Sequence, residues 1–283
     1  MEVAPFRPSI GIIGGRGRMG RWLERRLRHS GHAVSIADLS EGPLGAGFVQ
    51  ACQVLILAVP VAAVEKVMAA IGPLTRPEHL VMDIASLKAG PLASMLAHAK
   101  GEVIGTHPLF GPATRSLAGQ LVFVCPGRGS RWLGWLMNLL KEGRMQVVQM
   151  EAERHDRLMA QVQTLRHLLL VGLGRALMRL GFDPAQDLER SGPWFQGIMG
   201  MLAHQLRQPP ELYADLALHN PAGPEAMRVL GQSLAEVTGC LASGDRGGLV
   251  RLMEEVGSFL RGDKLGPGLD AAPHLVYKTG DAS

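Results

Sequence analysis

Cysteine is scarce in this chain of 283 residues, which has only three: Cys52, Cys125 and Cys240. Their number is odd and no two are spaced as CxxC, so neither a disulfide framework nor a zinc site is indicated. Each lies among apolar residues, and buried free thiols are the usual state in a reducing cytoplasm. We therefore expect a cytoplasmic protein that holds no metal.

Aromatic residues are also scarce, the net charge is small, and no apolar run is long. Only 5% of residues are aromatic, which leaves few platforms for stacking bases, and 29 basic against 25 acidic residues give a net charge of just +4. The longest apolar stretches, around 54–64 and 168–173, are too short to cross a bilayer, and the first ten residues lack the apolar core of a signal peptide. We expect small-molecule ligands, no nucleic-acid partner and no membrane segment.

Glycine is abundant, and its most informative cluster is segment 10–20, IGIIGGRGRMG, where an apolar run breaks into glycines and continues with helical periodicity. Gly15 permits a tight turn, Gly17 lets backbone N–H groups approach a pyrophosphate, and Gly20 lets the helix pack on the strand. The next predicted strand, 33–37, ends at Asp38, whose carboxylate suits a ribose 2′-hydroxyl and repels a 2′-phosphate. The expected cofactor is therefore NAD. Its expected contacts are Gly14, Gly15, Arg16, Gly17, Arg18, Met19, Gly20, Asp38, Val59 and Pro60.

Apolar strands alternate with helical segments as far as residue 150. Strands are predicted at 54–60, 80–84, 102–105, 121–125 and 145–148, and helices at 61–71, 91–100 and 131–140. This alternation predicts an α/β fold, with a Rossmann-type doubly wound parallel sheet over 1–150. From Glu151 the pattern is helical, which predicts an all-α domain over 151–262 and a loosely ordered tail over 263–283. Because the helical domain has little core of its own, we expect it to interlock with a second copy as a homodimer.

Polar side chains follow two of the predicted strands. Ser86 and Lys88 come after the strand 80–84, and His107 comes in the turn after the strand 102–105. Open α/β sheets place their ligand crevice at these carboxyl ends. A histidine, with an unperturbed pKa of about 6.5, can accept a hydrogen bond near neutral pH. His107 is therefore a stronger candidate for catalysis than for a bond to its own loop.

Two more histidines, His155 and His167, lie on the predicted helix 151–180. Twelve residues at about 100° each set them roughly 120° apart around the axis, so they do not share one face, whereas His155 and Arg166 nearly do. Taken alone, each is more often a packed helix histidine than a ligand.

Taken in order, the segments GGRGRMG, DIASLKAGPL, GTHPLFGP, EAERHDRLMAQVQTLRHLLL and PPELYADL resemble the prephenate dehydrogenase family over residues 10 to about 220. The likeness is strongest to the dehydrogenase half of enzymes that elsewhere carry a fused chorismate mutase, and we expect no mutase part in this chain. It implies NAD-dependent oxidative decarboxylation, in which hydride leaves C4 of a cyclohexadiene, carbon dioxide leaves C1, and the ring becomes aromatic.

The resemblance also implies roles for individual residues. His107 would accept a hydrogen bond from the 4-hydroxyl as hydride leaves, and Ser86 would bind the same region. Lys88, His167 and Tyr213 would lie near the substrate. His155 would support the site without taking part in the chemistry.

The sequence departs from the family at two arginines. The one that grips the ring carboxylate is replaced by His204, and a second by Gln196. Neither reproduces a bidentate guanidinium–carboxylate pair, although Arg207 could partly substitute. A branch of the family oxidises 4-amino-4-deoxyprephenate on the way to 4-aminophenylalanine in secondary metabolism. The altered grip slightly favours that substrate over the prephenate of tyrosine biosynthesis.

Two other kinds of function compete with this interpretation. The β-hydroxyacid dehydrogenases share the predicted architecture but use a lysine on the long helix, and segment 151–180 contains none. A non-catalytic NAD-binding regulator would account for the lost arginine. It would not account for the joint presence of Ser86, Lys88, His107 and His167.

Overall fold

The computed structural model describes residues 6–38, 42 and 44–260, and the predicted tail over 263–283 lies outside them. The described residues up to Ala160 form one compact unit with Ala214–Ala222, which we call the sheet unit. Gln161–Tyr213 and the described residues from Gly223 onward form the helical unit. The division falls later than the expected boundary at residue 150, because α6 (Ala152–Met159) buries four of its residues within the sheet unit.

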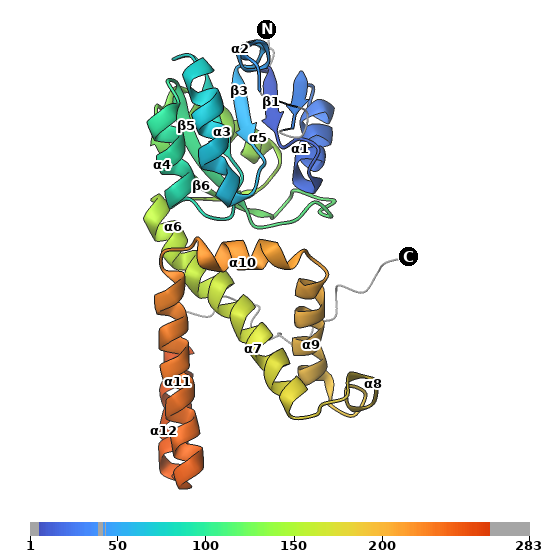
Figure 1. The fold of residues 1–283 in the computed structure, drawn as a ribbon, viewed down its shortest axis with the longest axis vertical. Helices are drawn as coiled ribbons and strands as arrows, with labels where there is room; N and C mark the ends of the chain where they lie inside the picture. Colours follow the sequence, from blue (N-terminus) through green and yellow to red (C-terminus); the bar gives the residue numbers. More distant parts are fainter. Residues whose placement is uncertain (1–5, 39–41, 43, 261–283) are drawn as a thin grey trace. The chain divides into compact units, whose positions relative to one another are not determined.

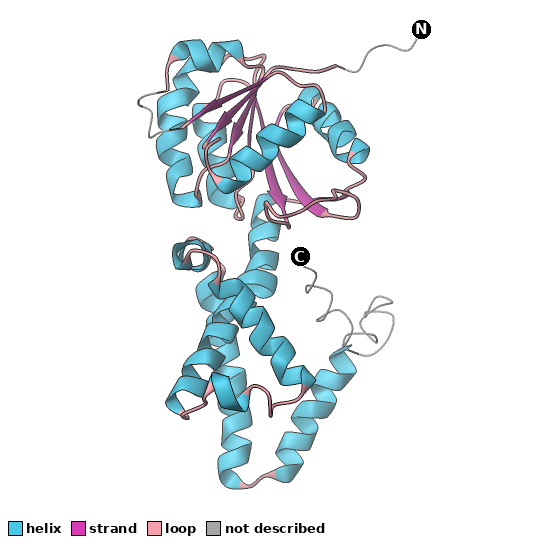
Figure 2. Cartoon of the chain, turned by 90° about the vertical axis from the view of Figure 1, so that its right-hand side faces the viewer, coloured by secondary structure: helices cyan, strands magenta, loops and turns pink. Residues whose placement is uncertain are grey.

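The sheet unit is an α/β fold, with helices on both sides of one sheet (Figures 1 and 2). Its strands are β1 (Ile10–Ile13), β2 (Val34–Ala37), β3 (Val54–Leu57), β4 (Leu80–Asp83), β5 (Glu102–Pro108), β6 (Leu121–Arg128) and β7 (Gln146–Gln149). Its other helices are α1 (Arg18–His29), α2 (Ala46–Ala51), α3 (Val64–Ile71) with flanking 3-10 turns, α4 (Ala89–His98) and α5 (Arg131–Glu142). The strand order is β2-β1-β3-β4-β5-β6-β7. The predicted doubly wound Rossmann sheet is confirmed.

One strand pair departs from the predicted parallel sheet. Strands β1 to β5 are parallel to their neighbours, but β6 runs antiparallel to β5. The segment between β5 and β6, residues 109–120, contains no helix, and a parallel return normally needs a helical crossover. Strand β5 is also longer than predicted, so His107 lies within the strand and pairs with Phe123 of β6.

Two apolar cores cover the two faces of the sheet. Leu55 and Leu57 of β3 belong to one core, with α3 and α4, while Val54 and Ile56 belong to the other, with α1 and α5. This alternation follows from the two-residue period of a strand. Because both faces are covered, the carboxyl edge of the sheet is where polar side chains gather.

The helical unit contains no strand among its described residues, as predicted. Its helices are α7 (Leu165–Arg179), α8 (Pro184–Asp187), α9 (Pro193–Leu206), α11 (Gly223–Ser243) and α12 (Arg246–Leu260), and α10 (Pro210–Leu218) begins in it. A π-helical turn, Ala160–Thr164, separates α6 from α7. Since a π turn adds a residue to the helical repeat, the 100° count that related His155 to His167 and Arg166 does not hold across it.

The three cysteines differ in how deeply they are buried. Cys52 and Cys125 are buried free thiols, as expected, but Cys240 is only half-buried. Burial raises the pKa of the Cys125 thiol to about 12.

In the part of the chain that the structure describes, no helix has the length and apolar character needed to span a membrane.

Candidate active site

The glycine loop 14–20 joins β1 to α1. Gly14 has a φ of 80°, and a Cβ on it would lie 2.5 Å from the Ala58 carbonyl oxygen, so a side chain is excluded twice over. A Cβ on Gly20 would collide with the Gly14 carbonyl oxygen. Because glycine has no Cβ, α1 can pack directly on the turn. Helix α1 begins after Gly17 without a side-chain cap. A helix start of this kind, after a glycine loop, is a typical binding place for an anion.

The other predicted cofactor residues lie at the same edge of the sheet. Ile13, the last residue of β1, is level with Ala37 of β2 and Leu57 of β3. Asp38, Val59 and Pro60 therefore follow strands that end beside the glycine loop. Among them Asp38 and Val59 are half-buried and Pro60 is exposed; within the loop, Met19 is half-buried, and Arg16 and Arg18 are exposed. The loop and this edge fit a dinucleotide.

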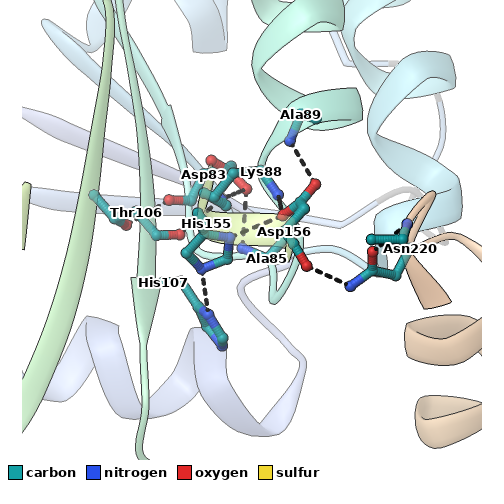
Figure 3. A network of polar contacts seen from close by, with 10 residues as sticks. Asp83, Ala85, Lys88, Ala89, Thr106, His107, His155, Asp156 and Asn220 are labelled. Carbon is teal, nitrogen blue, oxygen red and sulfur yellow. Dashed lines mark hydrogen bonds and ion pairs between the residues drawn. The ribbon is translucent and has the colours of Figure 1, made fainter. Parts of the chain in front are cut away.

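His107 ends a chain of three buried polar side chains (Figure 3). Its Nδ1 lies 2.9 Å from Nε2 of His155 on α6, and Nδ1 of His155 lies 2.8 Å from Oδ1 of Asp156. The exposed fractions of the three residues are 3%, 0% and 2%. Phe123 packs edge-on against the His155 ring, with 5.2 Å between ring centroids. The chain therefore has little freedom to rearrange.

The second ring nitrogen of His107 is directed away from this chain. Within the described residues, His107 Nε2 makes no hydrogen bond and is not among the fully buried unpaired atoms, so part of its surface is accessible. Burial lowers the pKa of His107 well below 6.5, and the nearby His155 and Lys88 lower it further. The imidazole is therefore neutral at physiological pH and can accept a proton. Ser86 is half-buried in the turn after β4.

Lys88, which the resemblance places near the substrate, turns its ammonium into the interior of the sheet unit. Its side chain is fully buried, and Nζ donates hydrogen bonds to Oδ2 of Asp83 and, at 2.7 Å, to the carbonyl oxygen of Thr106. The hydroxyl of Thr106 donates to the Asp83 carbonyl oxygen at 2.5 Å. Burial lowers the pKa of Lys88 and raises that of Asp83, so the two values approach each other. The pair joins the end of β4 to the strand that carries His107.

Asp156 holds several elements of the sheet unit together. Its Oδ1 accepts a hydrogen bond from Lys88 N at 2.7 Å, and its Oδ2 accepts one from Ala89 N at 2.9 Å. These N–H groups begin α4, so the carboxylate caps that helix. The side chain of Asn220 donates to the main-chain oxygen of Asp156 at 2.9 Å. Figure 3 shows these contacts around Asp156.

A second polar cluster lies in the helical unit around His167. Arg166 Nη2 is 3.0 Å from His167 Nε2, and His167 Nδ1 is 2.8 Å from Oε1 of Gln205. Because a guanidinium only donates, Nε2 of His167 accepts and Nδ1 donates. Burial lowers the pKa of His167, and the ring of Tyr213 lies 4.4 Å away between centroids.

His204 and Gln196, which the resemblance places where the family has arginines, lie outside this cluster. His204 is exposed on α9, whereas its neighbour Gln205 is buried and bound to His167. Gln196 is half-buried, and its amide donates to the carbonyl oxygen of Leu188 at 3.0 Å. Arg207 is exposed just after α9.

Four residues of these networks were not identified from the sequence: Asp83, Asp156, Gln205 and Asn220. Asp83 and Asp156 had a usable signal, because one ends an otherwise apolar strand and the other follows a candidate histidine. Gln205 and Asn220 had none, since each pairs with a residue more than thirty positions away.

Comparisons with known proteins agree with this architecture. The family model "Prephenate dehydrogenase, nucleotide-binding domain" matches residues 25–149, and "Prephenate dehydrogenase, dimerization domain" matches 151–255. A relative from Methanocaldococcus jannaschii, described as "Probable arogenate/prephenate dehydrogenase", is 32% identical over 87% of this chain and 60% of its own length. The chain thus spans well under two thirds of that relative.

Two further similarities bear on the ligands. The 4-amino-4-deoxyprephenate dehydrogenase of Streptomyces pristinaespiralis is 27% identical over 88% of this chain and 90% of its own length. The crystal structure of prephenate dehydrogenase from Aquifex aeolicus in complex with hydroxyphenyl propionate and NAD+ superposes with a TM-score of 0.70. It covers 90% of this chain and 98% of its own at 19% identity, which supports the fold alone. Because the two domain models match in succession along most of the chain, this protein belongs to the prephenate dehydrogenase family.

Proposed function

We propose that this protein catalyses the NAD-dependent oxidative decarboxylation of a prephenate-type cyclohexadiene. The proposal rests on His107, a neutral buried imidazole at the carboxyl edge of the sheet with one ring nitrogen held and the other accessible. NAD bound along the glycine loop would accept the hydride from C4. Gly14–Gly20, Asp38, Val59 and Pro60 are the residues that would hold it.

His107 supplies the proton acceptor in this proposal. As hydride leaves C4, the C4 substituent becomes more acidic, and Nε2 of His107 accepts its hydrogen bond and then its proton. Loss of carbon dioxide from C1 then leaves its electron pair in the ring, which becomes aromatic. The proton returns from His107 to the C4 substituent. Ser86, in the turn after β4, would bind the same substituent.

The first expected result is therefore NADH formation, measured at 340 nm with purified protein and prephenate, arogenate or 4-amino-4-deoxyprephenate. The initial rate with NAD should exceed that with NADP at equal concentration, because the Asp38 carboxylate suits a free 2′-hydroxyl. Faster reaction with NADP would reject the role of Asp38 and point to Arg16 or Arg18 as partners of a 2′-phosphate. Absence of reduced cofactor with every combination would reject the activity.

Among these substrates we propose 4-amino-4-deoxyprephenate as the preferred one. Its 4-amino group is protonated in water and must lose that proton before hydride can leave. A site with less positive charge accepts a cation at lower cost in a partly desolvated crevice. Gln196 and His204 stand where the family has arginines, and the relative from S. pristinaespiralis supports this choice.

Prephenate itself is the alternative substrate, favoured by a different observation. The relative from M. jannaschii, at 32% identity, is described as acting on arogenate or prephenate. That assignment would make this protein an ordinary enzyme of tyrosine biosynthesis.

A substitution at His204 separates these two substrates. His204→Arg should raise kcat/KM for prephenate by roughly 10- to 150-fold, because a hydrogen bond to a charged group contributes about 1.5–3 kcal/mol. Ala203→Arg is the matched control, since it adds the same charge on a neighbouring exposed position that faces about 100° away around α9. The proposal fails if the wild-type protein already prefers prephenate and His204→Arg brings no gain.

We propose a homodimer assembled through the helical unit, which matches the dimerization-domain model. Leu234, Val237 and Leu241 form an apolar stripe on α11 with exposed fractions of 51%, 45% and 71%, and Met253 and Val256 of α12 are 70% and 58% exposed. So much apolar surface is typical of an interface. Light scattering at micromolar concentration should give twice the chain mass of 30.3 kDa. A monomer would contradict the proposal.

A further inference from the structure

We infer that Asp156 is a positioning residue that selects, through His155, the tautomer in which His107 offers the lone pair of Nε2 to the substrate. The inference deepens the proposed function, because it concerns how the proposed proton acceptor is kept ready. Asp156 touches neither substrate nor cofactor in this scheme. It acts only through the two imidazole rings.

The carboxylate of Asp156 is held in one orientation. Oδ1 and Oδ2 accept separate hydrogen bonds from the first N–H groups of α4, at Lys88 and Ala89. The carboxylate therefore cannot turn away from His155.

The orientation of each proton then follows from this fixed acceptor. An ionised carboxylate only accepts, so His155 donates from Nδ1, and in a singly protonated ring its Nε2 keeps a lone pair. His107 must in turn donate from Nδ1 to that nitrogen. The remaining nitrogen of His107, Nε2, is thereby left as an acceptor. Which ring nitrogen of a histidine carries the proton is set by the partner of the other one, as here.

The opposite arrangement would disable the site. If His155 carried its proton on Nε2, His107 would have to accept at Nδ1 and would carry its own proton on Nε2. Such a ring donates to the substrate and cannot remove a proton from it. Without Asp156 nothing among the described contacts of His155 favours one arrangement over the other. Phe123 only packs against the His155 ring, and His107 can pair with either tautomer of it.

The test is to measure the tautomer of His107 directly, from the ring nitrogen chemical shifts of protein labelled with 15N-histidine at neutral pH. Signals of His107 are identified by their loss in His107→Asn. In the wild type Nδ1 should be protonated and Nε2 unprotonated. In Asp156→Ala and His155→Leu, a large fraction of His107 should move to the form protonated at Nε2. This readout needs no turnover, so it remains informative even if the proposed activity is absent.

Two comparisons separate positioning from mere structural support. His155→Gln should retain the wild-type tautomer, because its amide can donate to Asp156 and accept from His107, and its kcat should exceed that of His155→Leu at least tenfold. Asn220→Ala removes a bond to the main chain of Asp156 but leaves the carboxylate intact, so it should keep the wild-type tautomer. Asp156→Ala should lower kcat by about 10- to 100-fold without changing KM for NAD.

Three results would overturn the inference. One is a wild-type His107 protonated at Nε2. Another is an Asp156→Ala protein that is folded by circular dichroism and has the wild-type tautomer. The third is equal kcat in His155→Gln and His155→Leu.

Discussion

His107→Asn should lower kcat by about 10²- to 10⁴-fold, the range typical of a lost general acid–base group, while the affinity for NAD stays unchanged. Asparagine can form a hydrogen bond but cannot take up a proton as hydride leaves. His107 lies on β5 at the substrate side of the proposed site, whereas the cofactor contacts come from the glycine loop and from the ends of β2 and β3. Initial rates and NAD titration by fluorescence measure the two quantities separately.

His29→Asn provides a matched control, since His29 is exposed at the end of α1. It should have wild-type kcat. A His107→Asn protein within a few-fold of the wild-type turnover would remove His107 from the mechanism.

The same residue sets the expected pH dependence. In the proposed reaction the neutral form of His107 is the active one, and burial lowers its pKa well below 6.5, with smaller contributions from the neighbouring His155 and Lys88. Lowering the pH therefore protonates His107 only far below the ordinary histidine range. We expect kcat to stay level as the pH falls through 6.5 and to decline at lower pH. A decline centred at 6.5 or above would contradict the lowered pKa.

The glycine loop and the strand ends beside it were predictable because their signals are local. A glycine forced by positive φ at Gly14, or by close approach at Gly20, leaves a motif that is contiguous in sequence. Asp38 follows its strand immediately. The register of β1, β2 and β3 then brings these local motifs together without further information.

The network around His107 was predictable only in part. The sequence predicts His107 in a turn after a short strand, yet β5 continues through it to pair with β6. The partnership of His107 with His155 spans 48 positions and depends on where α6 docks. Periodicity on one helix cannot supply that position. The π turn after α6 also changes the angle per residue, so the helix faces of His155 and His167 cannot be related by counting residues.

The environment of Lys88 is a feature that the sequence does not show. It does follow the strand 80–84, where a ligand crevice is expected, but its ammonium turns inward to Asp83. Two charges with no exposed surface are tolerated because they pair with each other, and Thr106 accepts a further bond from the ammonium. A sequence does not show that a lysine is buried until the fold shows which carboxylate it pairs with.

Lys88→Met should therefore reduce the free energy of unfolding of the sheet unit by about 3–5 kcal/mol, because it leaves the buried Asp83 carboxylate without its cation. Asp83→Asn combined with Lys88→Met should recover most of this loss, since the neutral amide still accepts the hydrogen bond from Ala85 N. Urea unfolding measured by tryptophan fluorescence suits the comparison, because Trp22, Trp132 and Trp135 all lie in the sheet unit. Lys66→Met, at an exposed position on α3, is the control and should change stability by no more than about 0.5 kcal/mol.

The loss in Lys88→Met should also depend on pH in a definite direction. Burial raises the pKa of Asp83 above its ordinary value of 3.8, and Lys88 opposes that rise. Without Lys88 the folded protein binds a proton at Asp83 that the unfolded chain has already released, so folding is favoured as the pH falls toward that ordinary value. The destabilisation should be largest at neutral pH and should shrink in mild acid. A Lys88→Met protein as stable as the wild type at neutral pH would show that Asp83 is already protonated in the native fold and that no ion pair holds β4 to β5.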